Sequence, residues 1–200
     1  MSKTCTVEGC NGKHLAKGYC RKHYYQFKKY GHVLERTIYD ANEIIEYEDY
    51  AEIVLYDKDG NEVARTMIDL EYVDSVKKYK WYLTNNGYVT SNKVGKLHRF
   101  IMNPSEDMVV DHINHNKLDN RCDNLRICTH QENDWNKGPI STNTSGVTGV
   151  VKTQWNTWQS RIEVNGKRIC LGSFATLEEA EEARRQAEIE YFGEFAPNRE

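Results

Sequence analysis

The spacing of four potential metal ligands near the N-terminus is the feature that most constrains how this chain can fold. Three cysteines and one histidine lie within 19 residues of a short polar segment: Cys5, Cys10, Cys20 and His23. A segment of this size cannot bury enough apolar surface to fold without a cross-link. A structural zinc ion takes four such ligands, and the last two are spaced for one face of a helical turn. The sequence therefore predicts a module of residues 1–36 folded around one Zn²⁺ ion.

The alternative is that these are three ordinary cysteines and an unrelated histidine, which leaves a very polar segment without a source of folding energy. A catalytic zinc ion is not expected, because four protein ligands leave no open coordination position. Cationic and aromatic residues follow in residues 21–30. This mixture is typical of a nucleic-acid-binding surface, although a solvated helix face has the same composition. The candidate DNA contacts are Arg21, Lys22, Lys28 and Lys29.

Charge is distributed in blocks, so the net charge of −3 over 200 residues is a poor guide to binding partners. Residues 1–36 carry 8 basic and 2 acidic residues, residues 37–75 carry 2 and 12, and residues 76–110 carry 6 and 2. The basic N-terminal block can neutralise phosphates, and the acidic block can face away from them. The acidic block itself predicts no chemistry; a spacer, a scaffold and a protein-contact surface all fit it.

Composition argues against a membrane protein. The mean hydropathy is −0.79, and no run approaches the roughly 18 apolar residues of a membrane helix. The N-terminal residues lack the apolar core of a signal peptide. We therefore expect a soluble, cytoplasmic protein with mostly reduced cysteines and no membrane partner.

The chain divides into segments that differ in composition and hydrophobic pattern, and these segments predict an α+β fold of small modules. The expected boundaries are 1–36 for the zinc module, 43–103 for a β-hairpin region, 104–137 for a segment rich in Asp, His and Asn, 138–144 for a linker and 145–198 for a C-terminal module.

The middle region has two hairpin patterns. Strands are expected at 51–56 and 62–68 around a glycine-containing turn, and again at 80–84 and 88–90. The apolar pattern of residues 96–102 fits either a strand or a short helix.

The segment 109–137 combines a regular backbone pattern with unusual polar chemistry. Apolar residues lead into Asp111-His112, a polar loop follows, and a second short strand is expected at 124–128. Thr129 with Glu132 three residues later forms a capping box at the start of a helix. This order predicts a β-β-α unit.

The polar residues of this unit suit hydrolysis of a phosphodiester, which needs a base for water and a cation for the developing negative charge. His112 can serve as the base, because the unperturbed pKa of a histidine lies near neutrality. Asp111 and Asn133 offer hard oxygen ligands for Mg²⁺ or Mn²⁺. Successive residues on a strand point to opposite sides, so Asp111 and His112 should diverge unless the strand twists or ends there.

The order Asp-His, 11 residues, Asn, 8 residues, Asn resembles the HNH nucleases, in the phage homing-endonuclease branch whose last ligand is Asn. The resemblance covers residues 97–137. It implies a ββα-metal fold with one divalent ion bound by Asp111 and Asn133, His112 as general base, and Asn124 holding the loop through backbone hydrogen bonds. It also implies 5′-phosphate and 3′-hydroxyl products.

Other residues of the segment are weaker candidates. Arg99, with His98 beside it, could support the site or contact a phosphate, and Asn136 could touch the metal shell or DNA. His115 and His130 are more typical of surface positions. The remaining cysteines there, Cys122 and Cys128, are interpreted as small buried residues.

The C-terminal module is expected to be a three-stranded antiparallel sheet packed on one helix that begins with a capping box at Thr176. Its strands are basic and its helix is acidic. It resembles the Apetala-type (ethylene-response-factor) DNA-binding domain in its Gly146-Val147 start, its Asn165-Gly166 turn and its Leu171-Gly172 strand, although Thr148 replaces a usual arginine. The resemblance implies DNA contacts by four residues: Lys152, Trp158, Arg161 and Arg168. For Trp155, core packing and DNA contact remain equally open.

Three hypotheses follow, and the first is preferred. The chain is a site-specific, homing-type endonuclease acting on double-stranded DNA in a phage- or bacterium-derived setting inside the host cell. As a monomer it would nick, and as a homodimer it could cut both strands. The alternatives are a non-catalytic DNA-binding regulator with a nuclease-like fold, and a zinc-stabilised interaction protein.

Overall fold

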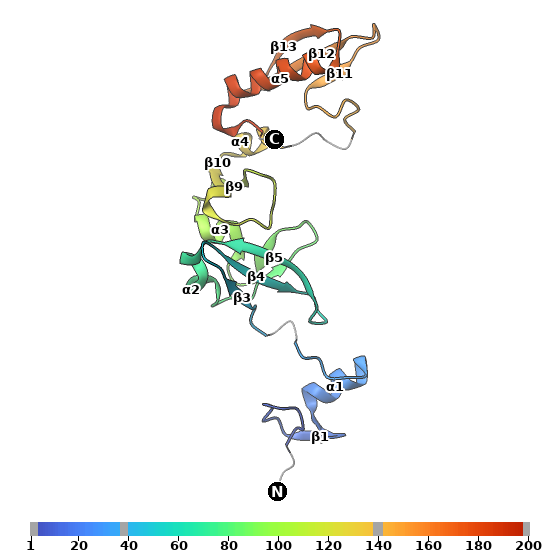
Figure 1. The fold of residues 1–200 in the computed structure, drawn as a ribbon, viewed down its shortest axis with the longest axis vertical. Helices are drawn as coiled ribbons and strands as arrows, with labels where there is room; N and C mark the ends of the chain where they lie inside the picture. Colours follow the sequence, from blue (N-terminus) through green and yellow to red (C-terminus); the bar gives the residue numbers. More distant parts are fainter. Residues whose placement is uncertain (1–3, 37–39, 138–141, 198–200) are drawn as a thin grey trace. The chain divides into compact units, whose positions relative to one another are not determined.

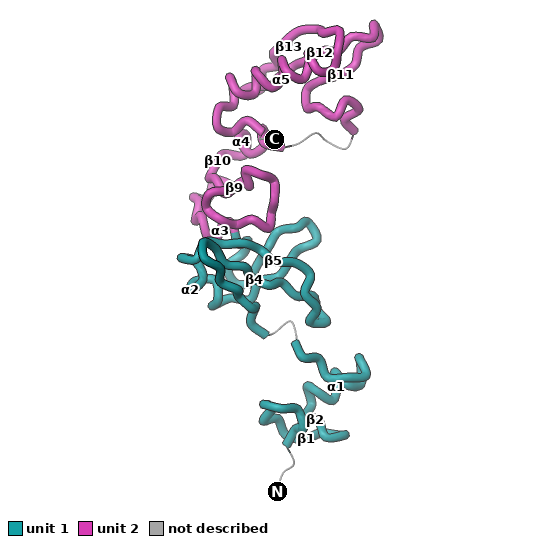
Figure 2. The backbone as a smooth tube through the Cα atoms, in the orientation of Figure 1, with its two compact units in different colours: residues 1–97 teal, residues 98–200 magenta. Residues whose placement is uncertain are grey.

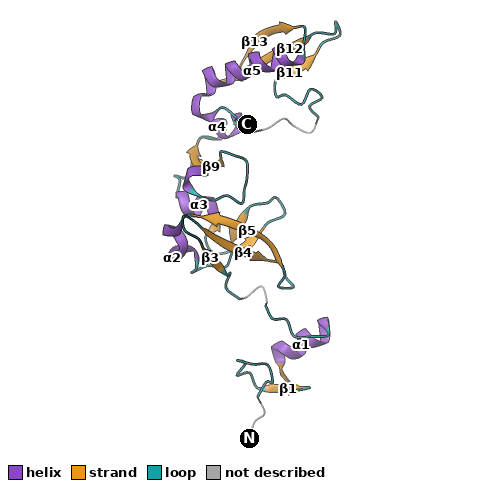
Figure 3. Cartoon of the chain, in the orientation of Figure 1, coloured by secondary structure: helices purple, strands orange, loops and turns teal. Residues whose placement is uncertain are grey.

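The computed structural model describes residues 4–36, 40–137 and 142–197. The chain forms two compact units, residues 1–97 and 98–200 (Figure 2). Helices lie between groups of short strands, and each sheet has two or three strands (Figure 3). The fold is therefore mixed α and β, as expected, with several separate sheets rather than one large one.

The N-terminal part of the first unit is a short hairpin followed by a helix. Strands β1 (His14–Ala16) and β2 (Tyr19–Cys20) pair antiparallel, and α1 (Arg21–Tyr30) starts directly after β2 (Figure 1). Gly31 ends the helix with a left-handed φ of 79°, a conformation that glycine adopts without steric cost. Across the described residues 4–36, the only buried side chains are three of the four potential metal ligands: Cys5, Cys20 and His23.

The β-rich region contains two three-stranded antiparallel sheets. The first has the order β3 (Ile44–Glu46), β4 (Ala51–Tyr56) and β5 (Glu62–Ile68), and confirms the hairpin expected at 51–68. The second is formed by β6 (Tyr82–Leu83), β7 (Val89–Ser91) and β8 (Gly95–Lys96). Strand β6 is shorter than the expected 80–84, β7 is shifted by one residue from the expected 88–90, and β3 and β8 were not expected.

Two short helical turns in this region were also missed. They are η1 (Leu70–Tyr72) and α2 (Val73–Val76), which precede the almost fully buried Trp81. The indole Nε1 of Trp81 donates to the carbonyl of Val76 at 2.9 Å. A four-residue helix has too few apolar repeats to give a periodic signal, which is why the sequence pattern does not reveal it.

The ambiguous segment at 96–102 is resolved as a helix, α3 (Leu97–Met102), and all of its residues except the first belong to the second unit. Strands β9 (Val109–His112) and β10 (Leu125–Cys128) pair antiparallel, with the turn η2 (Cys122–Asn124) between them. Helix α4 (His130–Trp135) begins with the Thr129–Glu132 capping box. The strand, strand and helix thus follow one another in the expected order.

The C-terminal part has three antiparallel strands in sequential order and one long helix (Figure 1). The elements are β11 (Val150–Lys152), β12 (Trp158–Val164), β13 (Lys167–Phe174), α5 (Leu177–Phe192) and η3 (Gly193–Phe195). The capping box of Thr176 with Glu179 is present, and Asn165 and Gly166 both have positive φ at the tight turn. Most of the expected linker at 138–144 lies outside the described residues.

Helix α4 packs against the C-terminal part. The ring of Trp135 stacks on Phe192 with centroids 4.4 Å apart and an interplanar angle of 8°. Gln131 also donates to Asn165 at 3.2 Å. The second unit is therefore continuous from the β9–β10 hairpin to α5.

Candidate active site and metal centre

Asp111 and His112 end strand β9, and both side chains are buried, at 9% and 5% exposure. Their neighbours differ. Asp111 lies opposite Arg126 across the strand pair, whereas His112 lies opposite Leu125, the first residue of β10. The two side chains thus have separate sets of partners, in agreement with the divergence expected of successive strand residues.

The carboxylate of Asp111 is held by one oxygen. Its Oδ2 accepts from Arg126 Nη2 at 2.8 Å and Nε at 3.0 Å, and from Asn136 Nδ2 at 2.8 Å. Arg126 is itself anchored, because it also donates to the carbonyl of Glu194 and lies over the ring of Phe195. Among the described residues, all hydrogen bonds to this carboxylate end on Oδ2, so Oδ1 is the oxygen suited to a cation.

The imidazole of His112 is oriented by Asn120. Its Nε2 lies 3.2 Å from Oδ1 of Asn120, whose Nδ2 donates to the carbonyl of Lys117. Because the amide nitrogen is used by Lys117, the oxygen faces the ring, and Nε2 is the protonated nitrogen of the neutral imidazole. The lone pair is then on Nδ1. The ring of His98 meets that of His112 edge-on, with centroids 5.0 Å apart.

Burial also sets the protonation of this histidine. Desolvation disfavours the charged imidazolium and lowers the pKa of His112, against opposing effects of Asn120 and Asp111. A neutral ring at physiological pH is the form that can accept a proton.

Asn124 braces the loop between the two strands. Its Oδ1 accepts from the backbone nitrogen of Asn114 at 3.0 Å, and its Nδ2 donates to the carbonyl of Asp119 at 2.8 Å. Arg121 forms a two-pronged ion pair with Asp119, and this pairing lowers the pKa of the Asp119 carboxyl. The loop is therefore fixed by hydrogen bonds rather than by apolar packing.

Helix α4 supplies two asparagines that behave differently. Asn133 is half-buried, and its side chain is in none of the hydrogen bonds that hold Asp111. Asn136, at the C-terminal end of α4, is 1% exposed and binds Asp111 and the carbonyl of His112. It ties the helix that carries Asn133 to the strand that carries Asp111.

The residues present fit a divalent cation. Within the described chain, Oδ1 of Asn136 is buried and accepts no hydrogen bond, which costs about 1–3 kcal/mol when nothing compensates. A hydrated cation beside Asp111 would provide donors through its water ligands, and carboxylate and amide oxygens are the ligands that Mg²⁺ and Mn²⁺ prefer.

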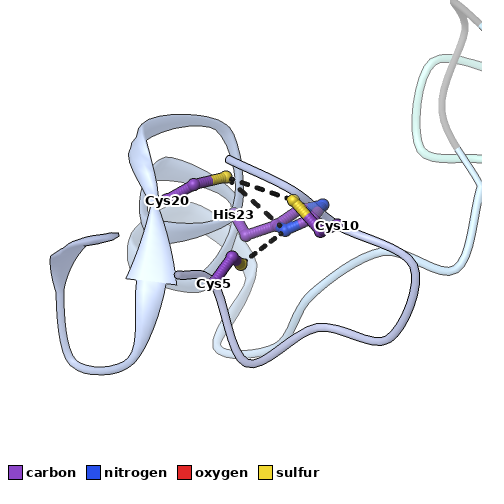
Figure 4. Close-up of side chains that lie close together, drawn as sticks. All are labelled: Cys5, Cys10, Cys20 and His23. Carbon is purple, nitrogen blue, oxygen red and sulfur yellow. Dashed lines mark hydrogen bonds between the residues drawn. The ribbon is translucent and has the colours of Figure 1, made fainter. Parts of the chain in front are cut away.

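The four N-terminal ligands converge on one point (Figure 4), with their ligand atoms all within 4.8 Å of one another. Cys5 Sγ lies 3.2 Å from His23 Nδ1, Cys20 Sγ lies 3.7 Å from the same nitrogen, and the sulfurs of Cys10 and Cys20 are 3.8 Å apart. A tetrahedral site with Zn–S bonds of about 2.3 Å separates its sulfurs by about 3.8 Å. The cluster could therefore hold a zinc ion.

The pKa of Cys5 and the close packing at Gly12 are both compatible with a zinc ion bound by this cluster. Burial alone would raise the pKa of the Cys5 thiol, but hydrogen bonds from His23 and the backbone outweigh it and lower the pKa to about 6. The thiolate is the form that binds metal. A Cβ at Gly12 would lie 2.7 Å from Cys20 Cβ, so only glycine fits beneath the cluster at this position.

The other DNA contacts predicted from the sequence differ in their exposure. Arg21, Lys22, Lys28 and Lys29 are all exposed on α1, and Lys29 also donates to Tyr30. Arg99 is half-buried and donates to the carbonyl of Met108 at 2.9 Å, which ties α3 to the start of β9.

The four candidate DNA contacts of the C-terminal sheet lie on two different faces of that sheet. Ser160 and Ile162 of β12 are buried, and Ile162 packs on α5, so Arg161 and its neighbour across the bulge, Cys170, face away from the helix. Arg168 pairs with Glu163 on that same open face, at 3.9 Å.

Trp158 instead packs against Val147, Val150 and Ala180 in the core, with the Lys152 ammonium 5.5 Å from its ring. Trp155, by contrast, is 76% exposed in the β11–β12 turn. Trp155 therefore does not pack in the core, whereas Trp158 does.

Sequence reasoning did not assign roles to Asn120 and Arg126, and it rated Asn136 as a weak candidate. The i, i+3 spacing of Asn133 and Asn136 was the available signal for the last of these. For Asn120 and Arg126 there was none, because their partners depend on how the loop and strands fold. The cysteine interpretation holds for Cys128, which is fully buried, but is wrong for Cys122, which is only half-buried.

Across the described residues, none of the helices combines the length and the apolar composition needed to cross a membrane.

Comparison with known proteins identifies the family. Residues 102–134 match the family model described as HNH endonuclease. An uncharacterized HNH endonuclease of Acanthamoeba polyphaga mimivirus is 39% identical over 142 residues, which cover 66% of this chain and 73% of the relative. Protein 3.8 of Escherichia phage T7 is 35% identical over 60 residues, which cover 30% of this chain and 50% of that protein. No solved structure matches this chain. The matched segment contains Asp111, His112, Asn124 and Asn133, and the chain therefore belongs to the HNH endonuclease family and is a DNA endonuclease.

Proposed function

We propose that the chain is a site-specific, homing-type endonuclease that hydrolyses double-stranded DNA to 5′-phosphate and 3′-hydroxyl ends. The observation that carries the proposal is the pre-oriented His112, whose Nε2 is directed at Asn120 beside a buried Asp111 carboxylate with one oxygen left for a cation. The viral relatives support a setting inside an infected cell.

In this proposal His112 is the general base. With the proton of the neutral ring on Nε2, Nδ1 takes the proton of the attacking water. Asn120 keeps the ring in that tautomer, and burial keeps it neutral. Asn124 holds the loop that carries Asn120.

A single divalent cation, Mg²⁺ or Mn²⁺, would be held by Asp111 and Asn133, and when bound it supplies positive charge for the phosphorane and the leaving 3′ oxygen. Asn136 and Arg126 are positioning residues, because both hold Asp111 by Oδ2 and so direct Oδ1 toward the ion. Arg126 adds a link to the C-terminal part through Glu194.

The flanking modules would supply affinity and site selection. We propose that a structural Zn²⁺ bound by Cys5, Cys10, Cys20 and His23 supports α1 and its exposed basic residues. An Apetala-type sheet would contact DNA through its open face, with Arg161 and Arg168, and through the exposed Trp155. A chain with one cutting centre nicks as a monomer and can cut both strands as a homodimer.

The test is cleavage of plasmid DNA that contains the chain's own locus, with Mg²⁺ or Mn²⁺. Wild type should convert supercoiled plasmid to nicked or linear product. His112→Ala should lower the rate at least about 100-fold, as loss of a general base does, while keeping DNA affinity. His130→Ala is the matched control, because His130 is an exposed histidine of the same segment.

A wild-type protein that binds DNA but leaves every plasmid intact would instead support the non-catalytic regulator. Sequencing the ends then checks the finer parts of the proposal. Products with 3′-phosphate ends, or cuts scattered at random, would contradict the proposed end chemistry or the proposed site specificity.

A further inference from the structure

The segment that leads into the second three-stranded sheet and forms it carries a concentration of positive charge that the proposed function does not use. Residues 76–96 contain five lysines and no acidic residue, whereas residues 37–75 contain 12 acidic and 2 basic residues. The β-rich region is thus strongly acidic in its first half and basic in its second. Such segregation orients a polyanion, because one surface repels it and the other attracts it.

Four of these lysines gather around one hollow in the surface of the first unit. It is lined by Lys77, Lys78 and Lys80, which follow α2, and by Lys93, which lies between β7 and β8. Tyr79, Tyr82, Ser91 and Asn92 complete the polar lining. Tyr82 donates to Asn92 at 2.5 Å, which ties the two sides of the hollow together. We call this feature the lysine groove.

The lysines differ in how their charge is used within the protein. Lys80 donates to the carbonyl of Asp40 at 2.6 Å, and its partial burial lowers its pKa. Lys77 pairs with Asp74 on the helix α2 side. Lys78 and Lys93 are exposed, and neither forms an ion pair with any residue that the structure describes. These two ammonium groups are therefore the ones available to a ligand.

We propose that the lysine groove binds the phosphate backbone of duplex DNA outside the cut site, with Lys78 and Lys93 as its principal contacts. The proposal rests on DNA being the substrate but not on the catalytic roles proposed above. The lining favours a phosphate backbone over a protein partner, because it combines four lysines with two tyrosine hydroxyls and includes no large aliphatic side chain of the kind that protein interfaces bury as anchors.

DNA binding in the lysine groove would explain why basic and acidic residues are segregated in this region. A flexible lysine is a point charge that tolerates variation in sequence and position, and it reads no base. The groove thus adds affinity without specificity, and the acidic surface limits the ways in which DNA can approach.

The experiment measures binding of the full-length chain to a fluorescent random-sequence duplex of about 40 base pairs, over a range of salt concentrations. All proteins carry His112→Ala so that cleavage does not disturb the measurement. The variants are Lys78→Gln, Lys93→Gln and their combination. Each lost phosphate contact should reduce the slope of log K against log salt by about 0.9, and the double variant should bind about tenfold or more weakly near 0.1 M salt.

Lys58→Gln is the matched control, because Lys58 is an exposed lysine of the same unit in the β4–β5 turn. It should leave the slope at the parent value, and Lys78→Arg with Lys93→Arg should restore it. Equal slopes for the double variant and Lys58→Gln would overturn the proposal, and would favour an acidic protein as the groove's partner. Since binding is read without cleavage, failure of the groove and failure of the nuclease proposal give different results.

Discussion

The Cys/His cluster and the Asp111–His112 site lie in the same chain but are organised in opposite ways. In the described residues 4–36, three of the four ligands of the cluster are the only buried side chains. At the Asp111–His112 site, the polar residues are held by other residues: Asp111 by Arg126 and Asn136, His112 by Asn120, and the loop by Asn124. We therefore expect the first region to depend on a metal for its fold, and the second to depend on its hydrogen-bonded frame.

The difference follows from what each site must do. A structural ion can use every coordination position for protein ligands, and its binding energy becomes folding energy. A catalytic ion must keep positions open for water and substrate, so it cannot also be the main source of order. The hydrogen-bonded frame around Asp111 supplies that order instead.

The largest expected effect is on the cluster. Cys20→Ser should abolish zinc binding, and because a structural zinc site contributes on the order of 10 kcal/mol, residues 1–36 should unfold. The β-rich region and the second unit should stay folded. Zinc content by mass spectrometry and limited proteolysis would measure both outcomes.

Cys170→Ser is the control, since Cys170 is exposed on β13 and far from the cluster in sequence. It should keep one zinc ion per chain. If Cys20→Ser also keeps the ion and the protease resistance of residues 1–36, then the module does not depend on zinc.

An intermediate effect is expected at Asn136. Asn136→Ala removes a neutral donor from Asp111 Oδ2 and the link between α4 and β9. Loss of such a supporting contact lowers metal affinity or activity by about 10–100-fold. Titration with Mn²⁺ followed by electron paramagnetic resonance would report affinity, and the cleavage rate at saturating Mn²⁺ would separate affinity from turnover.

Gln131→Ala, on the exposed surface of the same helix, should change neither quantity. Asn136→Asp should fail to restore the wild-type cleavage rate if the amide nitrogen is what matters, because it places a second carboxylate against Oδ2 where a donor is needed. Unchanged Mn²⁺ affinity in both Asn136 variants, with both proteins folded, would rule out the positioning role.

The smallest effect is expected at Trp155, which is part of neither the Cys/His cluster nor the Asp111–His112 site. Because it is 76% exposed, Trp155→Ala should leave the thermal stability unchanged and weaken duplex binding by about fivefold to tenfold. Trp158→Ala should do the reverse and lower the melting temperature, because Trp158 packs in the core. Equal DNA binding by wild type and Trp155→Ala would remove Trp155 from the proposed interface.

These regions also differ in how much of them could be predicted from sequence. The capping boxes at Thr129 and Thr176 and the turn at Asn165-Gly166 were predicted correctly, because each depends on chemistry within four residues. The ligand spacing of the cluster is equally local. Its four atoms lie within reach of one another, as the spacing indicates.

The frame around Asp111 could not be predicted in the same way. Arg126 and Asn136 meet Asp111 from 15 and 25 residues away, and only the paired strands and the packed helix bring them there. The roles of Trp155 and Trp158 likewise depended on the register of β11 and β12, which alternation in the sequence does not fix.

The most direct test of this contrast is amide hydrogen exchange on the metal-free chain, compared with the same chain after addition of zinc. The account predicts that in the metal-free chain residues 4–30 exchange at nearly unfolded rates, while β9, β10 and α4 stay protected. Zinc should then restore protection to residues 4–30 alone. Loss of protection in β9 and α4 on metal removal, or retained protection in residues 4–30, would contradict the account.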